Sequence, residues 1–414
     1  MVIMDKINFA DLTWVMIATA LVMIMTPTLA FFYGGLVRKK NVLSVLLQCL
    51  IILCVISIQW ILFGYSLAFG PDKGGVIGGL EWLGLNGVGM APHDTYMNTV
   101  PHQLFMIFQM MFAVITPALI IGSFVERIKF SGFLLFIILW ATLVYDPLAH
   151  WVWAKDGWLM SLGALDFAGG TVIHINAGIS ALIFVLLLGK RQGIEHPRSP
   201  HNLPLAVLGA GFLWFGWFGF NAGSAGAANI VAVSAFINTN TAAAAAGLTW
   251  MILDWLINKV PTMLGVATGL VAGLVAITPA SGYVTPLSAL VIGILAGIFC
   301  FLFVSKVKEQ FGYDDSLDVF GVHGIGGIVG ALATGLFATK TINDAGNNGL
   351  FYGNPHQLWI QFLTTIVAIA FSAIMTFILF KIVDMIIGMR VDIKDEYIGL
   401  DLTQQHETGY TLYD

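Results

Sequence analysis

Long apolar runs recur from one end of this sequence to the other and are separated by short polar segments. About 20 apolar residues in a helix cross the hydrocarbon core of a bilayer, and eleven stretches meet that requirement. Hydrophobic residues make up 58% of the chain and charged residues 10%, whereas about 25% of a typical soluble domain is charged. The sequence therefore predicts an all-α polytopic membrane protein with eleven transmembrane helices. The expected spans are 14–37, 42–69, 102–125, 131–150, 168–189, 204–224, 231–257, 262–279, 286–305, 318–339 and 357–387.

Several other classes are disfavoured. Outer-membrane barrels have alternating segments of about ten residues, and the runs here are longer and continuously apolar. Cys49, Cys54 and Cys300 all lie in apolar runs, so we expect neither a disulfide framework nor a metal cluster. The net charge of −5 argues against nucleic-acid binding. The sequence has no nucleophile and base pair, phosphate loop or metal-ligand set, so we expect neither enzymatic activity nor a cofactor.

Lysine and arginine are unevenly divided between the two sides that these spans create. Basic residues concentrate in the cytoplasmic loops of membrane proteins. With the N-terminus outside, fourteen of the 18 basic residues share one side, and only Lys6, Lys73, Lys155 and Lys340 lie on the other. We therefore predict an N-out, C-in topology. The transmembrane domain is expected over residues 1–387 and a cytoplasmic C-terminal tail over residues 388–414.

Two histidines lie inside apolar spans. The segment DFAGGTVIHINAG (166–178) carries His174 in the fifth span, and DVFGVHGIGG (318–327) carries His323 in the tenth. Each histidine follows an aspartate, Asp166 or Asp318, and is surrounded by glycines. Because ionisable side chains are costly within a membrane, they mark a substrate or proton path by default. We therefore expect both imidazoles to line a pore.

The two histidine segments are five spans apart, so they cross the membrane in opposite directions. Inverted repeats have this arrangement, with the ligand site at the midplane between the halves. The sequence thus predicts an inverted five-helix repeat, formed by helices 1–5 and 6–10. The alternative is that two glycine-rich histidine helices arose independently.

The chemistry of paired imidazoles favours a substrate that itself carries a proton. A neutral imidazole has one donor and one acceptor, so two in contact can share a single proton. A second positive charge at low dielectric would be very unfavourable. Metal binding is a rival interpretation, but two histidines fall short of the three or four ligands expected for zinc. A buried structural histidine pair is another.

The expected outer mouth has residues suited to an arriving cation. Trp153, in AHWVWAKDGW (149–158), offers a ring face that can hold a cation with about 0.5 to 2 kcal/mol. Ser224 adds a hydroxyl at the outer end of the sixth span. The alternative for Trp153 is an interfacial belt residue. We expect Asp166 to be structural, since a carboxylate at the head of a helix accepts hydrogen bonds from its free N–H groups.

Ten segments, in order, carry a family resemblance. They are FFYGGLVRKKNVLS (31–44), GYSLAFG (64–70), ERIKFS (126–131), DFAGGTVIHINAG (166–178), GKR (189–191), HNLP (201–204), WFGFNAGSA (217–225), GLVAITPASGYV (273–284), DDSLDVFGVHGIGG (314–327) and GLD (399–401). Together they resemble the ammonium transporter family, Amt/Mep/Rh, and its Amt branch in particular. The resemblance runs from Thr13 to Asp401.

The resemblance implies a role for particular residues. An outer ammonium site matches Trp153, Ser224 and Phe112. Two stacked rings that close the outer pore match Phe112 and Phe220. The family's twin imidazoles match His174 and His323, and the tryptophan that lines the pore near them matches Trp217. The carboxylate associated with the outer site matches Asp166.

The resemblance also implies the assembly and its partners. We expect a homotrimer in the plasma membrane, with one pore in each eleven-helix protomer and methylammonium as a substrate analogue. The tail retains the GLD element of residues 399–401. A PII-type nitrogen-regulatory protein is therefore expected at the cytoplasmic face, with the tail as a regulatory segment.

Physical cost favours transport of ammonia rather than of the intact ion. An unpaired ion in an apolar pore costs several kcal/mol or more, and a neutral hydrogen-bonding molecule costs far less. Ammonium can give up a proton, whereas potassium cannot. No TVGYG-like run of a carbonyl filter is present in the sequence. Two other functions remain open, an ammonium sensor that signals through its tail or a partner, and a gas channel of the Rh type, which Trp153 and Ser224 disfavour.

Overall fold

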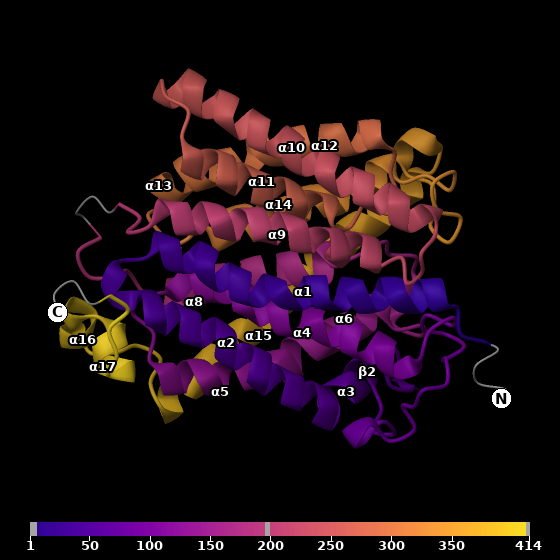
Figure 1. Cartoon of the computed structure of the whole chain (residues 1–414), viewed down its shortest axis with the longest axis horizontal. Coiled ribbons are helices and arrows are strands. Elements are labelled where there is room, and N and C mark those ends of the chain that lie inside the picture. Colours follow the sequence, from indigo (N-terminus) through magenta and orange to yellow (C-terminus); the bar gives the residue numbers. More distant parts are fainter. Residues whose placement is uncertain (1–5, 195–198, 411–414) are drawn as a thin grey trace.

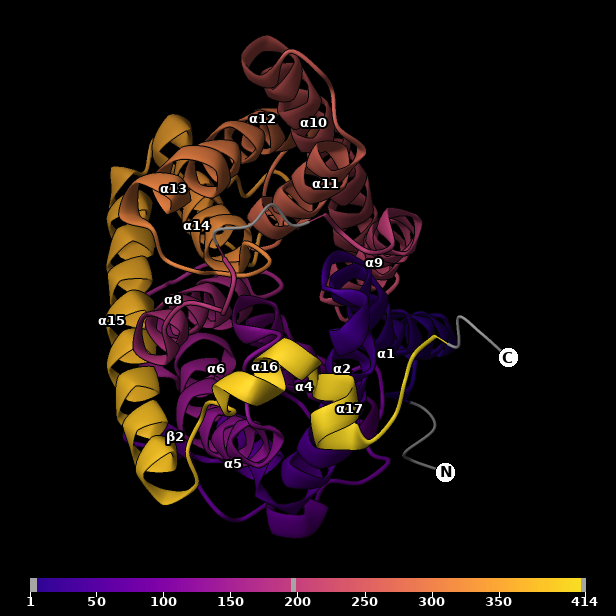
Figure 2. The ribbon, with the colours of Figure 1, turned by 90° about the vertical axis from the view of Figure 1, so that its left-hand side faces the viewer.

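Most helices of the chain run in the same general direction along its long axis (Figure 1), and the helix at Pro355–Ile386 crosses them obliquely (Figure 2). The structure is a computed structural model that describes residues 6–194 and 199–410. Within these residues, ten helical spans are long and apolar enough to cross a membrane, and the shorter apolar helix α11 (Met263–Ile277) supplies an eleventh. Each of them overlaps one predicted range. The prediction of an all-α membrane protein with eleven spans is confirmed.

Several spans are built from more than one helical segment. In chain order, the eleven are α1 (Phe9–Leu36); α2 (Val42–Gln59), η3 (Trp60–Gly64) and α3 (Tyr65–Phe69); α4 (His102–Phe124); α5 (Phe130–Trp140), η5 (Ala141–Tyr145) and α6 (Asp146–Trp153); η6 (Gly170–Ile175) and α8 (Asn176–Leu188); α9 (Leu203–Gly223); α10 (Ile230–Asn258); α11; α12 (Pro286–Leu302), η7 (Phe303–Val307) and α13 (Lys308–Phe311); η8 (Phe320–Gly324) and α14 (Ile325–Phe337); and α15 (Pro355–Ile386).

Short elements lie at the two ends of the bundle. They are η2 (Lys39–Asn41), η4 (Leu83–Leu85), α7 (Trp158–Ser161), η9 (Leu350–Tyr352), α16 (Ile393–Ile398), α17 (Leu400–Gln405) and the strands β1 (Asp72–Lys73) and β2 (Ile77–Gly78). The two strands pair antiparallel and are the only named strands in the described part of the chain. Following the predicted topology, we call the end that holds the start of α1 the outer end. The end that holds α16 and α17 is the inner end.

The bundle has two groups of helices that meet along a central seam. Figure 2 shows the N-terminal helices, indigo to magenta, below the orange helices of the second half. At the seam, α1 packs against α9, and η6 with α8 packs against η8 with α14. The long helix α15 runs along one side and contacts α5, α8 and α14.

Turns of π-helix repeat between the two halves. The fourth and fifth spans contain η5 and η6, and the ninth and tenth contain η7 and η8. A further π-turn, η3, interrupts the second span. Turns of this kind are rare and occur frequently at functional sites. The five-span separation of the two pairs agrees with the predicted inverted repeat.

The fifth and tenth spans cross with their backbones in contact. A Cβ atom on Gly178 would lie 2.1 Å from the amide nitrogen of Gly324 and 2.3 Å from its Cα. A Cβ on Gly327 would lie 2.9 Å from the carbonyl oxygen of Gly170. Small residues permit this approach in lipid, where the hydrophobic effect does not drive helix association. The crossing brings the two histidine-bearing π-turns together.

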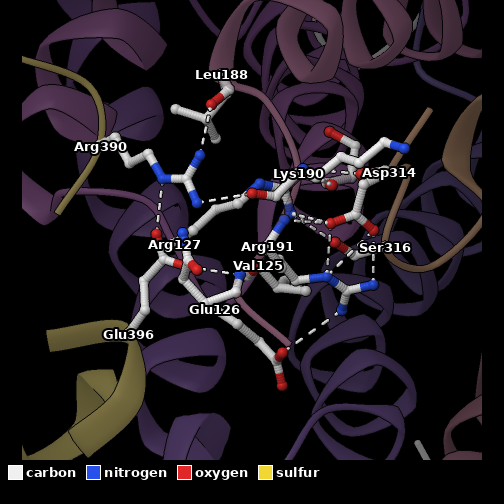
Figure 3. A network of polar contacts seen from close by, with 12 residues as sticks. Val125, Glu126, Arg127, Leu188, Lys190, Arg191, Asp314, Ser316, Arg390 and Glu396 are labelled. Carbon is white, nitrogen blue, oxygen red and sulfur yellow. Dashed lines mark hydrogen bonds and ion pairs between the residues drawn. The ribbon is translucent and has the colours of Figure 1, made fainter. Parts of the chain in front are cut away.

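Charged side chains tie the inner ends of the two halves to the tail (Figure 3). Arg191, which follows the fifth span, holds Asp314 with Nε to Oδ2 at 2.9 Å and Nη2 to Oδ1 at 2.8 Å. Arg127 donates from Nη2 to the carbonyl of Asp314 at 2.7 Å. Arg390 pairs with Glu396 at 2.6 Å. Loops from both halves and from the tail are therefore linked in one network.

The tail also caps the second span. The carboxylate of Asp401 accepts hydrogen bonds from the backbone N–H groups of Ser44 at 2.8 Å and Leu43 at 3.1 Å. The N–H of Leu400 donates to the side-chain oxygen of Asn41 at 2.8 Å. A negative charge at the start of a helix satisfies free donors and complements the helix dipole. The tail thus docks at the inner start of α2.

Substitution of Gly178 by alanine tests the close crossing. We expect Gly178→Ala to lower the free energy of unfolding by about 1 to 3 kcal/mol, because its methyl group meets the backbone of Gly324. Gly211→Ala is the matched control, since no described atom other than its chain neighbours and the nearby backbone of α9 lies within 4 Å of its Cβ position. Thermal melting of the purified proteins in detergent measures both. Equal melting temperatures for Gly178→Ala and the unaltered protein would contradict the crossing.

Acid titration tests the inner network. Burial alone would raise the pKa of Asp314, but hydrogen bonds and attraction from Arg191, aided by Arg127, lower it from 3.8 to about 2. A depressed pKa contributes stability that is present above about pH 4 and is lost as the pH falls through about 2. We expect Asp314→Asn to cost about 2 kcal/mol at pH 5 and progressively less toward pH 2. A difference in melting temperature that does not change with pH would refute this.

Candidate functional site

Three cavities follow one another along the seam between the two halves. The outer cavity, of about 640 Å³, is lined by residues that include Phe112 and Trp153. The central cavity, of about 10 Å³, reaches from Phe220 to His323. The inner cavity, of about 410 Å³, also includes His323 in its wall. A cavity of roughly 10 to 15 Å³ is the least that holds one water, so the central cavity separates two much larger spaces.

The outer cavity contains the residues expected at a cation site. Trp153, Ser224 and Phe112 all line it. The Trp153 indole is fixed because its Nε1 donates to the backbone carbonyl of Asp166 at 2.9 Å. The hydroxyl of Ser224, at the end of α9, donates to the carbonyl of Phe220 at 2.8 Å. Its lone pairs are left to accept from another donor.

Two aromatic rings separate the outer cavity from the central one. Phe112 is part of the outer wall, and Phe220 is part of the central wall. Their ring centroids are 4.6 Å apart, with the planes inclined at 58°. The rings are therefore in contact. They are tilted, whereas the resemblance implies a stacked, parallel pair. Both side chains are buried, and their contact lies between residues that line the two cavities.

The two histidines meet at the inner end of the central cavity. Nδ1 of His323 lies 3.2 Å from Nδ1 of His174, and the ring planes are within 16° of each other. Both side chains are buried, His174 at 1% and His323 at 4% exposure. Nε2 of His174 is buried without a hydrogen-bond partner. A buried polar nitrogen of this kind is costly unless something bonds to it, and the cavity is the place where a ligand can.

The contact between the two Nδ1 atoms constrains the protons. A hydrogen bond between them needs one proton, so one ring donates and the other accepts. In the neutral pair, one Nε2 then carries a hydrogen and the other carries a free lone pair. The pair therefore presents one donor and one acceptor along the pore. This arrangement suits a small molecule that can both donate and accept, such as ammonia.

Trp217 lies beside His174 in the pore wall. The ring centroids are 5.5 Å apart and the planes are nearly parallel, at 18°. The indole Nε1 donates to Oγ1 of Thr278 at 2.9 Å. That hydroxyl in turn donates to the carbonyl of Leu274. Thr278 carries no signal in the sequence, because its role depends on a contact between α9 and the end of α11.

Asp166 caps the π-turn η6. Its Oδ1 accepts from the N–H groups of Gly169 at 3.0 Å and Gly170 at 2.6 Å. Its Oδ2 accepts from Thr171 at 2.8 Å and Val172 at 3.1 Å. Four backbone donors surround the carboxylate and fix the start of the turn that bears the first pore histidine. These contacts match the structural role expected from the sequence.

The second histidine turn has a cap of its own, and it is Asp315 rather than Asp318. Oδ2 of Asp315 accepts from the N–H of Phe320, the first residue of η8, at 2.7 Å. Asp318 instead pairs with Lys308 at 2.6 Å. Burial raises the pKa of Asp315 to about 6, although Lys308 opposes the shift. Asp318, the aspartate that begins the segment containing His323, therefore does not cap the turn.

A spacing in the sequence identifies the second cap. Asp166 stands eight residues before His174, and Asp315 stands eight residues before His323. In each case the eight residues include a short non-helical segment followed by most of the π-turn, η6 or η8. A comparison of equal spacings, rather than of the nearest aspartate, selects the correct residue.

No metal-binding arrangement accompanies the histidines. Among residues 6–194 and 199–410, no group of three or more histidine, cysteine, aspartate or glutamate side chains lies close enough together to hold a metal ion. The two imidazoles face each other through Nδ1. The donor set therefore does not fit zinc, which takes three or four ligands.

Comparisons with known proteins agree with the geometry. The sequence profile of the Ammonium Transporter Family matches residues 13–410. An ammonium transporter of Bacillus subtilis (strain 168) is 52% identical over 403 residues, covering 97% of this chain and 99% of the relative. The crystal structure of Candida albicans Mep2 superposes with a TM-score of 0.90 at 36% identity, covering 99% of this chain and 94% of that one. A structure named Sensor Amt Protein has a TM-score of 0.88 at 31% identity and covers 95% of this chain and 98% of its own. The chain belongs to the ammonium transporter family.

Proposed function

We propose that this protein transports ammonium by collecting the cation at the outer cavity, removing a proton and conducting ammonia past the two histidines. The observation that carries the proposal is the central cavity of about 10 Å³, which has apolar walls apart from Trp217 and the facing imidazoles. A hydrated ion does not fit there. A molecule of the size of ammonia does.

Energy favours the neutral species in this space. The desolvation of an ammonium-sized ion costs several kcal/mol even after the protein relaxes, and no carboxylate lines the central cavity among the residues described. Ammonia needs only a hydrogen-bond partner, and the unpartnered Nε2 of His174 supplies one. Ions that cannot lose a proton, such as potassium, are excluded by the same cost.

The outer residues would select and hold the cation before it loses its proton. Trp153 and Phe112 offer ring faces, and Ser224 offers an acceptor oxygen. Cation–π attraction adds about 0.5 to 2 kcal/mol for each well-placed ring. Phe112 and Phe220 would then act as the gate, admitting one molecule at a time to the central cavity. The proton would leave through the histidine pair or be released outside.

The surroundings of the pore suit the expected assembly. Large apolar side chains of α10 are exposed on the bundle, including Ile230, Val233 and Leu256. Such a surface fits a lipid bilayer or a second protomer, and we propose a homotrimer in the plasma membrane. Residues 1–387 would form the transmembrane domain, with the N-terminus outside. Residues 388–414 would form a cytoplasmic regulatory tail that a PII-type protein approaches.

A sensing role is the second candidate. It is favoured by the similarity of this chain to the structure named Sensor Amt Protein. A sensor would bind ammonium in the outer cavity and signal through the docked tail with little transport. Uptake of labelled methylammonium by vesicles that contain only this protein separates the two functions. Rapid, saturable uptake supports transport, and binding without uptake supports sensing.

Replacement of both histidines tests the pore. We expect His174→Leu combined with His323→Leu to reduce the ratio of ammonium to potassium flux by about 10- to 100-fold, because ammonia loses partners worth about 1 to 3 kcal/mol. Flux into vesicles is measured with each cation in turn. His356→Leu is the control, since His356 is exposed at the start of α15. Unchanged selectivity in the double variant would sink the twin-histidine mechanism.

Removal of one gate ring tests the division between mouth and gate. We expect Phe220→Ala to change the maximum rate and to let water into the central cavity, while the half-saturation concentration for uptake moves by less than about twofold, a difference below about 0.4 kcal/mol. Phe218→Ala is the matched control. The ring of Phe218 stacks on that of Phe236, with the ring centroids 4.0 Å apart, and Phe218 does not line the outer or the central cavity. Loss of outer binding in Phe220→Ala would show that Phe220 belongs to the binding site instead.

A further inference from the structure

Among the described residues that line the inner cavity, every charged side chain but one belongs to an ion pair. Arg38 lies 2.9 Å from Glu126, and Arg191 pairs with Asp314 at 2.8 Å. On the other wall, Asp318 pairs with Lys308 at 2.6 Å. These pairs neutralise most of the charge that faces the cavity. The remaining charged group is a carboxylate on α10.

Asp254 is that carboxylate. It lines the inner cavity and is 4% exposed. Its Oδ1 accepts from Nδ2 of Asn258 at 3.0 Å, and its Oδ2 accepts from the hydroxyl of Thr262 at 2.6 Å. Both donors are neutral, and no lysine, arginine or histidine of the described chain pairs with it. A buried carboxylate without a counter-ion is costly, and in a membrane protein it indicates a path for cations or protons.

An indole stands one helical turn from this carboxylate. Trp250 lies four residues before Asp254 on α10, so the two side chains share a face of the helix. Both line the inner cavity, and Trp250 is 4% exposed. The ring of Phe301 packs edge to face against the indole, with the two ring centroids 5.5 Å apart. Thr268, on α11, adds a hydroxyl to the same wall.

These groups have the chemistry of a small-cation site. A carboxylate, an aromatic face and a hydroxyl oxygen together replace the hydration of a monovalent cation that donates hydrogen bonds. The same cavity is bounded by His323. Ammonia that passes the histidine pair enters this space and can take up a proton from hydronium or water of the solution at the inner end, which leaves water or hydroxide behind. The cation that results meets a negative charge that no positively charged side chain of the described residues pairs with.

We propose that Asp254 and Trp250, with Thr268, form an inner binding site for ammonium at the exit of the pore. The site rests on the proposed transport function, because it binds the product of that function. It gives the inner cavity a role that corresponds to the role of Trp153 and Ser224 in the outer cavity. Efflux then begins at this site, and influx ends there.

Asp254 also has a structural role that a test must separate from binding. Thr262 caps α11 by accepting from the N–H of Gly265 at 2.9 Å, and Asp254 orients that hydroxyl. Asp254→Asn preserves the size of the side chain and keeps an oxygen that accepts from Thr262. It removes the negative charge and replaces the oxygen that accepts from Asn258 by a donor, which the Asn258 amide can meet by presenting its own oxygen. A melting temperature within about 2 °C of the unaltered protein shows that the cap is intact.

Anomalous diffraction tests occupancy directly. Crystals of the full chain are soaked in thallium(I), a monovalent cation of suitable size. We expect an anomalous peak between the indole of Trp250 and the carboxylate of Asp254, reduced when ammonium is added in excess and absent in Asp254→Asn. The absence of a peak at this position in the unaltered protein overturns the proposal. This readout does not depend on transport.

Directional kinetics tests the role in transport. In vesicles of known protein orientation, we expect Asp254→Asn to raise the ratio of the half-saturation concentration for efflux to that for influx about tenfold, a difference of about 1.4 kcal/mol. Trp153→Leu should lower the same ratio. Ser305→Ala is the control, because Ser305 lines the cavity but donates to Phe301 of its own span.

The outcomes distinguish this proposal from the general one. Transport by Asp254→Asn with an unchanged ratio overturns the inner site and leaves the proposed function in place. A lack of ammonium flux in the unaltered protein overturns the proposed function, whereas the thallium experiment still decides the site. If Asp254→Asn does not fold, Trp250→Leu is used in its place, with the same expected direction of change in the ratio.

Discussion

The contact between two imidazoles, 3.2 Å apart at Nδ1, is the interaction on which the pore depends. It requires two helices of opposite direction to cross within backbone distance, and the glycines at 178 and 324 permit that crossing. It also requires each ring to leave the helix toward the seam, which the π-turns η6 and η8 allow by widening the helix locally. A bulkier residue at either crossing position would separate the rings and leave two unpartnered histidines in an apolar space.

Two carboxylates hold these π-turns from opposite ends of the bundle. Asp166 binds four backbone donors at the outer start of η6, and Asp315 binds the first donor of η8 at the inner end. Each is buried, and each stands eight residues before its histidine. The repeat is therefore visible in chemistry as well as in helix order, since capping, π-turn and imidazole recur together in both halves.

The sequence was sufficient to predict the parts of the molecule that depend on local pattern. Hydropathy predicted eleven spans, and the two histidines that stand out in apolar helices are the ones that meet at the seam. Other features depend on which side chains meet across the bundle. Asp318 is the nearest aspartate to His323 in the sequence, yet Lys308 takes it as a partner. Likewise, Asp254 is recognised as a carboxylate without a charged partner only when the ion pairs of Arg38 and Arg191 are known. The 58° angle between the rings of Phe112 and Phe220 depends on how their helices pack.

The distribution of charge along the three cavities supports the proposal that the substrate loses a proton. The outer and inner cavities, of about 640 and 410 Å³, are large enough for hydrated cations and carry aromatic and oxygen ligands. The central cavity of about 10 Å³ has hydrogen-bonding nitrogens but, among the residues described, no negative charge. A cation is therefore stable at both ends and unstable between them, and only a species that becomes neutral crosses at low cost. Under the proposed mechanism, selectivity comes from the acid–base chemistry of the substrate, and the size of the pore mainly keeps water from carrying other ions through.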